Sequence, residues 1–189
     1  CCIAAEEPVA TEAALPFAVA EAFSIIARKF CKSVLVPAFS VNAVGPRYLA
    51  VACREFGAKL VHLSTDYVFD GLKKSPYVET DRPNPQSVYA ISKFAGEMSV
   101  SSLLENHILV RSSGLYGAAG CLGKGGGNFI ENVIQKANEG KPLKIVMDEF
   151  VAPTYTKDLA RKILDLVRRD QRGLFHVVNH GGCSCMNSP

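Results

Sequence analysis

The chain has 189 residues, 48% of them hydrophobic and 21% charged, and its 21 basic and 18 acidic residues leave a net charge of +3. This length allows one domain of ordinary size. The charges of both signs are mixed along the chain, which excludes a basic nucleic-acid-binding stripe. No run reaches the roughly 18 apolar residues of a membrane span, and residues 1–7 lack a signal-peptide pattern. We therefore expect no nucleic acid and no membrane among the partners.

The seven cysteines are scattered along the chain. The only close pairs are Cys1 with Cys2 and Cys183 with Cys185, and neither pair has the spacing typical of a zinc site. We interpret the cysteines as reduced and structural and predict no metal. Reduced cysteines favour a cytoplasmic location.

Both ends of the sequence look abrupt. The first methionine is Met98, and the chain stops at Pro189 soon after a strand-like run at 173–179. Residues 1–17 have no stable pattern, since Pro8 and Pro16 would interrupt a helix. We therefore expect this sequence to be a fragment of a longer protein.

Hydrophobic periodicity predicts helices alternating with strands. In the first part of the chain it predicts a helix at 18–30, a short strand at 32–40, and a second helix at 41–56 that Gly57 ends. A mostly apolar strand at 59–64 follows, as expected for a strand covered on both faces.

The middle of the chain begins with a proline-rich loop at 72–86. Ser87 is a plausible N-cap for a helix at 88–103. The apolar residues of that helix at helical spacing predict its buried stripe, which we assign to Val88, Ile91, Ala95 and Met98. A strand at 107–112 comes next.

The last part of the chain contains a glycine-rich loop at 117–127, a helix at 129–139 that stops at Gly140, and a short strand at 143–147. An amphipathic helix follows at 156–169, and a final strand at 173–179. In the glycine-rich loop, Gly125 follows Lys124 where a nucleotide triphosphatase loop needs Ser or Thr, which excludes that motif. We interpret it as a substrate-side loop.

Strands alternating with helices predict an α/β fold with a parallel sheet. Ligands of such sheets bind at the carboxyl ends of the strands. Ser64, Thr65 and Asp66 stand at one such end, and Ser112 and Ser113 at another. His62 and His176 lie within strand-like runs, where we expect core histidines rather than ligands.

Tyr89 and Lys93 lie four residues apart and therefore share one face of the predicted helix. A lysine ammonium favours the phenolate form of a neighbouring tyrosine and lowers its pKa. A shift of about two or three units from roughly 10 makes the phenol useful for general acid catalysis near neutral pH. The plainer interpretation is a half-buried tyrosine beside a surface lysine, because this spacing is common by chance.

The surrounding motifs favour the catalytic interpretation. The run Ser64-Thr-Asp-Tyr-Val-Phe-Asp-Gly71 followed by Tyr89-x-x-x-Lys93 resembles the extended short-chain dehydrogenase/reductase superfamily, and most closely its dTDP-4-dehydrorhamnose reductase family. The segments 41–50, 153–160 and 173–179 are similar to other parts of that family. The resemblance covers about residues 40–184.

The resemblance implies NADPH- or NADH-dependent reduction of a dTDP-linked 4-keto-6-deoxy sugar, a step of dTDP-rhamnose biosynthesis. It implies that Tyr89 donates the proton and that Lys93 orients it, with both contacting the cofactor. Thr65 would polarise the substrate carbonyl, and Thr65 and Asp66 would contact the nucleotide sugar. The implied partner is the nucleotide-sugar substrate, and a homodimer stays open. The implied fold is a partial Rossmann-type sheet with a small carboxyl-terminal portion on the substrate side.

Two departures from the family pattern matter. Residues 1–40 contain no glycine-rich turn to accept the cofactor pyrophosphate, so we divide the chain into an unmatched segment, 1–40, and a partial NAD(P)-binding reductase domain, 41–189. Gly114 stands where the reductases tend to carry an aromatic residue that stacks on the base. We expect this chain alone to bind the cofactor poorly and leave open whether it is active.

Two other functions remain open. Relatives include the regulatory beta subunit of methionine adenosyltransferase, a binding partner rather than an enzyme, and Gly114 is compatible with that role. Nucleotide-sugar epimerases and dehydratases share the tyrosine and the lysine but regenerate their NAD. Net consumption of reduced cofactor would separate a reductase from these two.

Overall fold

The computed structural model describes residues 35–117, 129–140 and 150–184. The chain divides into two units, Cys1–Pro37 and Ala38–Pro189. A short helix at 36–39 spans the boundary between the units, and every other described element belongs to the second unit. The predicted helix at 18–30, the strand at 143–147 and most of the glycine-rich loop lie outside the described residues. Within those residues, no helix is long and apolar enough to cross a bilayer.

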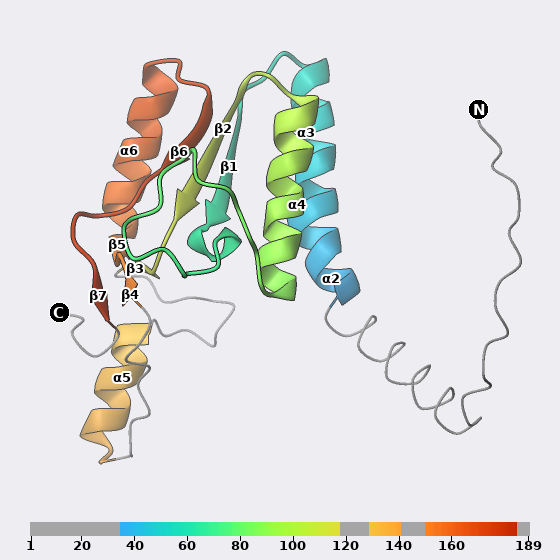
Figure 1. The fold of residues 1–189 in the computed structure, drawn as a ribbon. Coiled ribbons are helices and arrows are strands. Elements are labelled where there is room, and N and C mark those ends of the chain that lie inside the picture. Colours follow the sequence, from blue (N-terminus) through green and yellow to red (C-terminus); the bar gives the residue numbers. More distant parts are fainter. Residues whose placement is uncertain (1–34, 118–128, 141–149, 185–189) are drawn as a thin grey trace, which may run out of the picture. The chain divides into compact units, whose positions relative to one another are not determined.

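Three parallel strands form the central sheet in the order β1-β2-β6 (Figure 1). Strand β1 is Leu60–Thr65, β2 is His107–Ser112 and β6 is Gly173–His176. Their register pairs Leu60 with His107 and Ile108 with Gly173. All three strands were predicted from the sequence, although β6 ends three residues earlier than its apolar run suggests.

Helices α3 and α4 cover one face of the sheet. Helix α3 is Gly45–Glu55 and α4 is Val88–Leu103, and they lie side by side in Figure 1. The buried residues of this layer are Ala50, Val100, Leu104 and Leu109. Leu109 is the contribution of the central strand to this face.

Helix α6, Thr156–Arg168, covers the opposite face. Its Leu159 and Leu166 pack against Ile108 and Val110 of β2. Successive side chains of a strand point to opposite faces, so Ile108 and Val110 meet α6 while Leu109 meets α3 and α4. Each fully buried aliphatic side chain contributes about 1.5–3 kcal/mol, which explains why β2 reads as a continuous apolar run.

The predicted strand at 32–40 is wrong, because Val36–Phe39 form a short helix, α2. Pro37 weakens a strand but fits the first turn of a helix, where its missing N–H costs nothing. A π-helical turn, η2 at Ser40–Val44, continues from α2 into α3. Pro46 cannot donate to the carbonyl of Asn42 four residues earlier, which explains the irregular turn at this point.

The helix predicted at 88–103 is confirmed, and the Ser87 hydroxyl caps it by accepting the Ala90 N–H at 3.2 Å. Its predicted buried stripe is wrong, since Ile91 is 44% exposed and Met98 is 55% exposed. The helix instead buries small and polar residues, namely Ala90, Ser92, Gly96, Glu97 and Val100. The apolar periodicity alone could not show that Ser92 and Glu97 find buried partners.

The remaining elements are short. The chain turns through a 3-10 helix, η3 at Asp66–Val68, directly after β1. Helix α5, Phe129–Asn138, matches the predicted helix, and Gly140 follows it with a positive φ of 64°. Four two-residue strands that the sequence did not indicate form two small pairs: β3 (Leu115–Tyr116) with β5 (Thr154–Tyr155), and β4 (Phe150–Val151) with β7 (Cys183–Ser184).

Candidate functional site

Helix α4 carries Tyr89, Lys93 and Glu97 at intervals of four residues, which places them along one face of the helix. Tyr89 lies in the first turn and is 50% exposed. The ring of Tyr67 in η3 meets it edge to face, with 6.2 Å between the ring centroids. The phenol therefore lies near the carboxyl end of β1 and remains open to a ligand.

Lys93 reaches the outer edge of β1. Its Nζ donates to the carbonyl oxygen of Leu63 at 2.6 Å. The Leu60 N–H bonds Asn106 across the pair β1–β2, and backbone groups of alternate residues in a parallel strand point to opposite sides, so the carbonyl of Leu63 faces away from β2. Among the described residues β1 has no strand on that side, and the Lys93 ammonium lies at this open edge.

Burial lowers the pKa of Lys93, and the negative charge of Glu97 raises it in part. Glu97 therefore favours the charged ammonium form of Lys93 from one helical turn away.

Thr65 and Asp66 lie at the carboxyl end of β1, as predicted. Thr65 is 7% exposed and caps η3, since its hydroxyl accepts the Tyr67 N–H at 3.2 Å. The same hydroxyl donates to Asp66 Oδ1 at 3.1 Å. A substrate carbonyl would have to take the place of the Asp66 carboxylate as acceptor.

Ser112 and Ser113 lie at the carboxyl end of β2, next to the end of β1. Each is 5% exposed. Neither hydroxyl has a hydrogen-bond partner within the part of the chain that the structure describes. Since buried hydroxyls are usually bonded, this edge of the sheet offers two polar groups to a ligand, and the residues present fit the nicotinamide end of a dinucleotide.

Behind the tyrosine and the lysine lies a buried ion pair that sequence reasoning missed. Arg111 of β2 donates from Nη2 to Glu97 Oε2 at 2.6 Å and from Nε to Oε1 at 3.0 Å. The hydroxyl of Ser64 donates to the same carboxylate. The exposed fractions of the Arg111 and Glu97 side chains are 5% and 4%. An arginine inside an apolar strand run was the signal that could have indicated a buried partner.

Polar contacts within the loop at 70–86 and between this loop and the end of β6 hold the loop in place. Asp70 accepts hydrogen bonds from the Leu72 N–H at 3.0 Å, from Asn84 at 3.0 Å and from the Tyr77 hydroxyl at 2.7 Å. These bonds lower the pKa of Asp70 to about 2. In the middle of the loop, Glu79 accepts the backbone N–H of His176 at 2.8 Å, which lowers the pKa of Glu79.

Phe69 joins this loop to the buried ion pair. Its ring stacks on Tyr77 with 4.2 Å between centroids, and the guanidinium of Arg111 lies 5.1 Å from its centroid. The ring also meets His176 edge to face. A single aromatic side chain thus connects Arg111, the loop and the end of β6.

His62 and His176, predicted as core histidines, are both partly buried. Burial lowers the pKa of His62 to about 4, with a smaller contribution from the charge of Lys93. The Nε2 atoms of both rings lack a partner among the described residues. Within those residues no three metal-binding side chains gather into a site.

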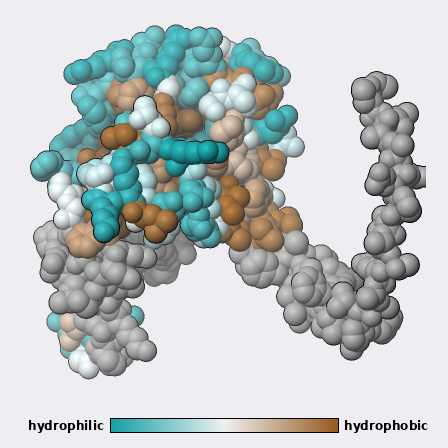
Figure 2. All heavy atoms as spheres, in the orientation of Figure 1, coloured by the Kyte–Doolittle hydropathy of each residue, from teal (hydrophilic) through white to brown (hydrophobic). Residues whose placement is uncertain are grey.

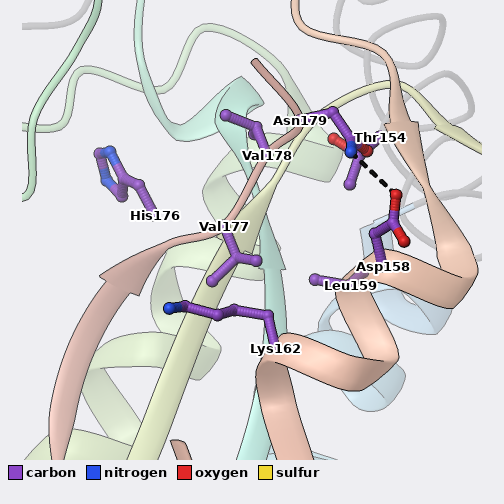
Figure 3. A pocket seen from close by; sticks show the side chains of 8 residues that line it. All are labelled: Thr154, Asp158, Leu159, Lys162, His176, Val177, Val178 and Asn179. Carbon is purple, nitrogen blue, oxygen red and sulfur yellow. Dashed lines mark hydrogen bonds between the residues drawn. The ribbon is translucent and has the colours of Figure 1, made fainter. Parts of the chain in front are cut away.

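A separate pocket of about 230 Å³ lies on the α6 side of the sheet (Figure 3). Its polar lining comes from Thr154, Asp158, Lys162, His176 and Asn179. Asn179 donates to Asp158 at 3.1 Å and accepts the backbone N–H of Tyr155 at 2.7 Å. These groups fasten α6 to the end of β6, and neither Tyr89 nor Lys93 lines the pocket.

Gly114 adopts a backbone that side chains rarely take. Its φ is +45°, and a Cβ there would lie 3.3 Å from Pro153 Cα. Its carbonyl accepts the Thr154 N–H at 3.0 Å. The position where an aromatic residue was expected is therefore strained and crowded for any side chain.

Comparison with known proteins finds one matching family model, the RmlD substrate binding domain, over residues 18–188. A dTDP-4-dehydrorhamnose reductase of Sinorhizobium fredii is 38% identical over 154 residues, which is 78% of this chain and 50% of the relative. The match to the family thus begins upstream of the boundary drawn at residue 40.

Solved structures give the same result. A dTDP-4-dehydrorhamnose reductase of Clostridium acetobutylicum superposes with a TM-score of 0.75 at 40% identity, covering 82% of this chain and 52% of that one. The reductase of Bacillus anthracis in complex with NADP gives 0.70 at 40% identity, with 76% and 49% covered. These likenesses confirm the predicted partial Rossmann-type α/β class. The chain spans about half the length of the relatives it matches.

Proposed function

Because this chain belongs to the family described as the RmlD substrate binding domain, we propose that the whole protein is a reductase of nucleotide-linked sugars. By whole protein we mean a protein that contains these residues and is as long as the relatives. It would reduce the keto group of a dTDP-linked 4-keto-6-deoxy sugar with NADPH or NADH. The observation that carries the proposal is the position of Tyr89 and Lys93 beside the strand end that holds Thr65. The names of similar reductases agree with this chemistry.

In this proposal Tyr89 is the general acid. A reduced nicotinamide, when bound, would supply a hydride for the carbonyl carbon of the substrate. Tyr89 would give its phenolic proton to the carbonyl oxygen, so that the ketone becomes an alcohol. The positive charge of Lys93 would stabilise the phenolate that Tyr89 becomes. From the open edge of β1, Lys93 would hold the cofactor ribose together with Tyr89.

Thr65 would donate its hydroxyl proton to the substrate carbonyl oxygen and polarise it for attack. Asp66, which now accepts that hydrogen bond, would then be free to contact the sugar. The buried hydroxyls of Ser112 and Ser113 lie at the neighbouring strand end and add donors for the nicotinamide.

The chain alone would bind the cofactor poorly, because its first 40 residues contain no glycine for a turn that accepts the pyrophosphate. An NADPH titration of the 189-residue chain, with thermal unfolding followed in parallel, tests this. We expect cooperative thermal unfolding with a melting temperature that NADPH does not raise. A micromolar dissociation constant would contradict the prediction.

The reductase itself is tested by mixing the whole protein with NADPH and a dTDP-4-keto-6-deoxy sugar. We expect loss of NADPH absorbance in proportion to the alcohol formed. If the sugar changes without net loss of reduced cofactor, the protein is an epimerase or dehydratase and the proposal fails. Solved structures of that kind are similar at 22% identity, which supports the shared fold only.

A regulatory subunit is the second candidate, and the observation that favours it is Gly114. The crowded backbone there leaves no room for an aromatic side chain to stack on a nucleotide base. A whole protein without turnover that forms a stable complex with methionine adenosyltransferase would support this candidate. The retained Thr65, Tyr89 and Lys93 favour the reductase.

A homodimer and a cytoplasmic location belong to the same proposal. Apolar side chains of η2, α3 and α4 are exposed, among them Val41 at 72%, Tyr48 at 69% and Met98 at 55%. Figure 2 shows hydrophobic residues gathered near the amino-terminal end of α4. Light scattering of the purified protein would give its oligomeric state.

A further inference from the structure

We propose that Glu97 is a positioning residue of this site, which fixes Lys93 and helix α4 against the end of β1 through Arg111 and Ser64. The inference rests on the proposed function, because the site that Glu97 would organise is the reductase site. It assigns a task to a buried carboxylate that the proton and hydride transfers do not use.

The contacts of Glu97 join three elements. The residue lies one helical turn after Lys93 on α4. Its carboxylate accepts from Arg111 of β2 at 2.6 and 3.0 Å and from the hydroxyl of Ser64 of β1. Ser64 directly precedes Thr65, so the helix that carries the acid and the strand that carries the polarising hydroxyl are joined at one carboxylate.

The position of the Arg111 guanidinium favours a carboxylate at position 97. Both carboxylate oxygens face the guanidinium, and a bidentate pair of this kind fixes orientation as well as distance. A buried ion pair is weak support for stability, since the cost of desolvation can exceed the attraction. Fixed geometry and a fixed charge beside Lys93 are therefore the better reasons for its presence.

Titratable side chains on the elements next to Lys93 include His62 on β1, Arg111 on β2, Asp66 and Tyr67 on η3, and Tyr89 and Glu97 on α4 itself. Among them, His62 and Glu97 interact electrostatically with Lys93. The turn η2 has no titratable side chain. In the cluster that α3 shares with α4, Ala50 is apolar and the partly buried Cys53 carries a titratable thiol. His62 is neutral near pH 7 because burial lowers its pKa to about 4. Of this set, Glu97 is the one that raises the pKa of Lys93.

The test follows the ionisation of Lys93 by NMR in the full chain labelled with carbon-13 lysine, with Lys93→Met used to assign the signal. Glu97→Gln removes the carboxylate charge and leaves Arg111 uncompensated, so both changes disfavour the ammonium. We expect the titration midpoint of Lys93 to fall by about one unit or more. Glu105→Gln is the matched control, because Glu105 is exposed, and it should leave the midpoint unchanged.

A variant that does not leave a buried charge keeps the test decisive. In Glu97→Gln combined with Arg111→Met, no unpaired guanidinium remains, and we expect a smaller shift of Lys93 in the same direction. An unshifted midpoint in either folded variant would overturn the proposal. If neither variant folds, the ion pair is purely structural and the proposal is likewise overturned.

This experiment uses no substrate and no cofactor, so its outcome is separate from that of the reductase assay. A shifted midpoint in a protein without turnover would refute the reductase and keep Glu97 as the residue that controls Lys93. Turnover with an unshifted midpoint would keep the reductase and refute the task assigned to Glu97.

Discussion

Gly96 of α4 lies directly against the backbone carbonyl of Asn42 in η2, and a Cβ at this position would overlap that oxygen. Pro46, four residues after Asn42, has no N–H to donate to this carbonyl. The side chain of Asn42 adds a hydrogen bond to Ser92 at 3.0 Å. The α3–α4 layer that supports Tyr89 and Lys93 therefore depends on the absence of a side chain at residue 96.

Gly96→Ala should destabilise the protein strongly. The added methyl group must displace backbone rather than a flexible side chain, which costs about 3 kcal/mol. Urea unfolding measures the effect. Gly45→Ala is the control, because its Cβ would lie at an ordinary 3.5 Å from Ser40 O and should be neutral or slightly stabilising. Equal stability of the two variants would contradict the close contact.

Arg111→Met should lower the free energy of unfolding by about 3–5 kcal/mol, because it leaves the Glu97 carboxylate buried without its partner. The matched control is Arg161→Met, which breaks an ion pair with Asp158 whose two side chains are 75% and 46% exposed. That change should cost less than about 1 kcal/mol. Chemical denaturation at pH 7 measures the free energy of unfolding of both variants. Similar losses of stability in Arg111→Met and Arg161→Met would argue against a buried ion pair.

His62 should make stability fall in mild acid. Its pKa is about 4 in the folded protein and 6.5 in the unfolded chain. Between these pH values the His62 imidazole is protonated in the unfolded chain and neutral in the native state. Stability is complete above pH 6.5 and declines until about pH 4, by at most about 3 kcal/mol. Thermal melts across this range should show a slope that His62→Gln reduces and His180→Gln, at an exposed position, does not.

Asp70 should hold the loop at 70–86 in place. Asp70→Ala removes the acceptor for Leu72, Tyr77 and Asn84 and should speed amide exchange across the loop. Because the pKa of Asp70 is lowered to about 2, its contribution is present above pH 4 and lost as the pH falls toward 2. Asp165→Ala, on the exposed face of α6, should leave loop exchange unchanged. Unchanged exchange in Asp70→Ala would exclude this role.

The sequence predicted those features that depend on local pattern. The apolar runs indicated β1, β2 and β6, Ser87 marked the start of α4, and glycines 57 and 140 marked helix ends, where both adopt positive φ. The family resemblance is confirmed by the matching family model. The strand end at Thr65 and Asp66 and the helix face with Tyr89 and Lys93 also lie as predicted.

Features that depend on distant partners were missed. The buried face of α4 was misassigned because the buried Glu97 finds its ionic partner in Arg111, fourteen residues later on strand β2. Within the strand predicted at 32–40, Val36–Phe39 are helical, and the turn η2 joins them to α3. Hydrophobic periodicity reports the local preference for helix or strand. It indicates neither an ion pair between two elements nor the continuation of one helix into the next. The roles of Thr65, Asp66, Tyr89 and Lys93 stay predictions.

The most direct test of the account is the rate of NADPH oxidation by the whole protein with Tyr89→Phe, using a dTDP-4-keto-6-deoxy sugar as substrate. Removing the phenolic proton should lower kcat by about 10²–10⁴-fold. Tyr48→Phe, at a position 69% exposed on α3, should retain the wild-type rate. A wild-type rate in Tyr89→Phe would contradict the proposed mechanism and with it the central role given to helix α4.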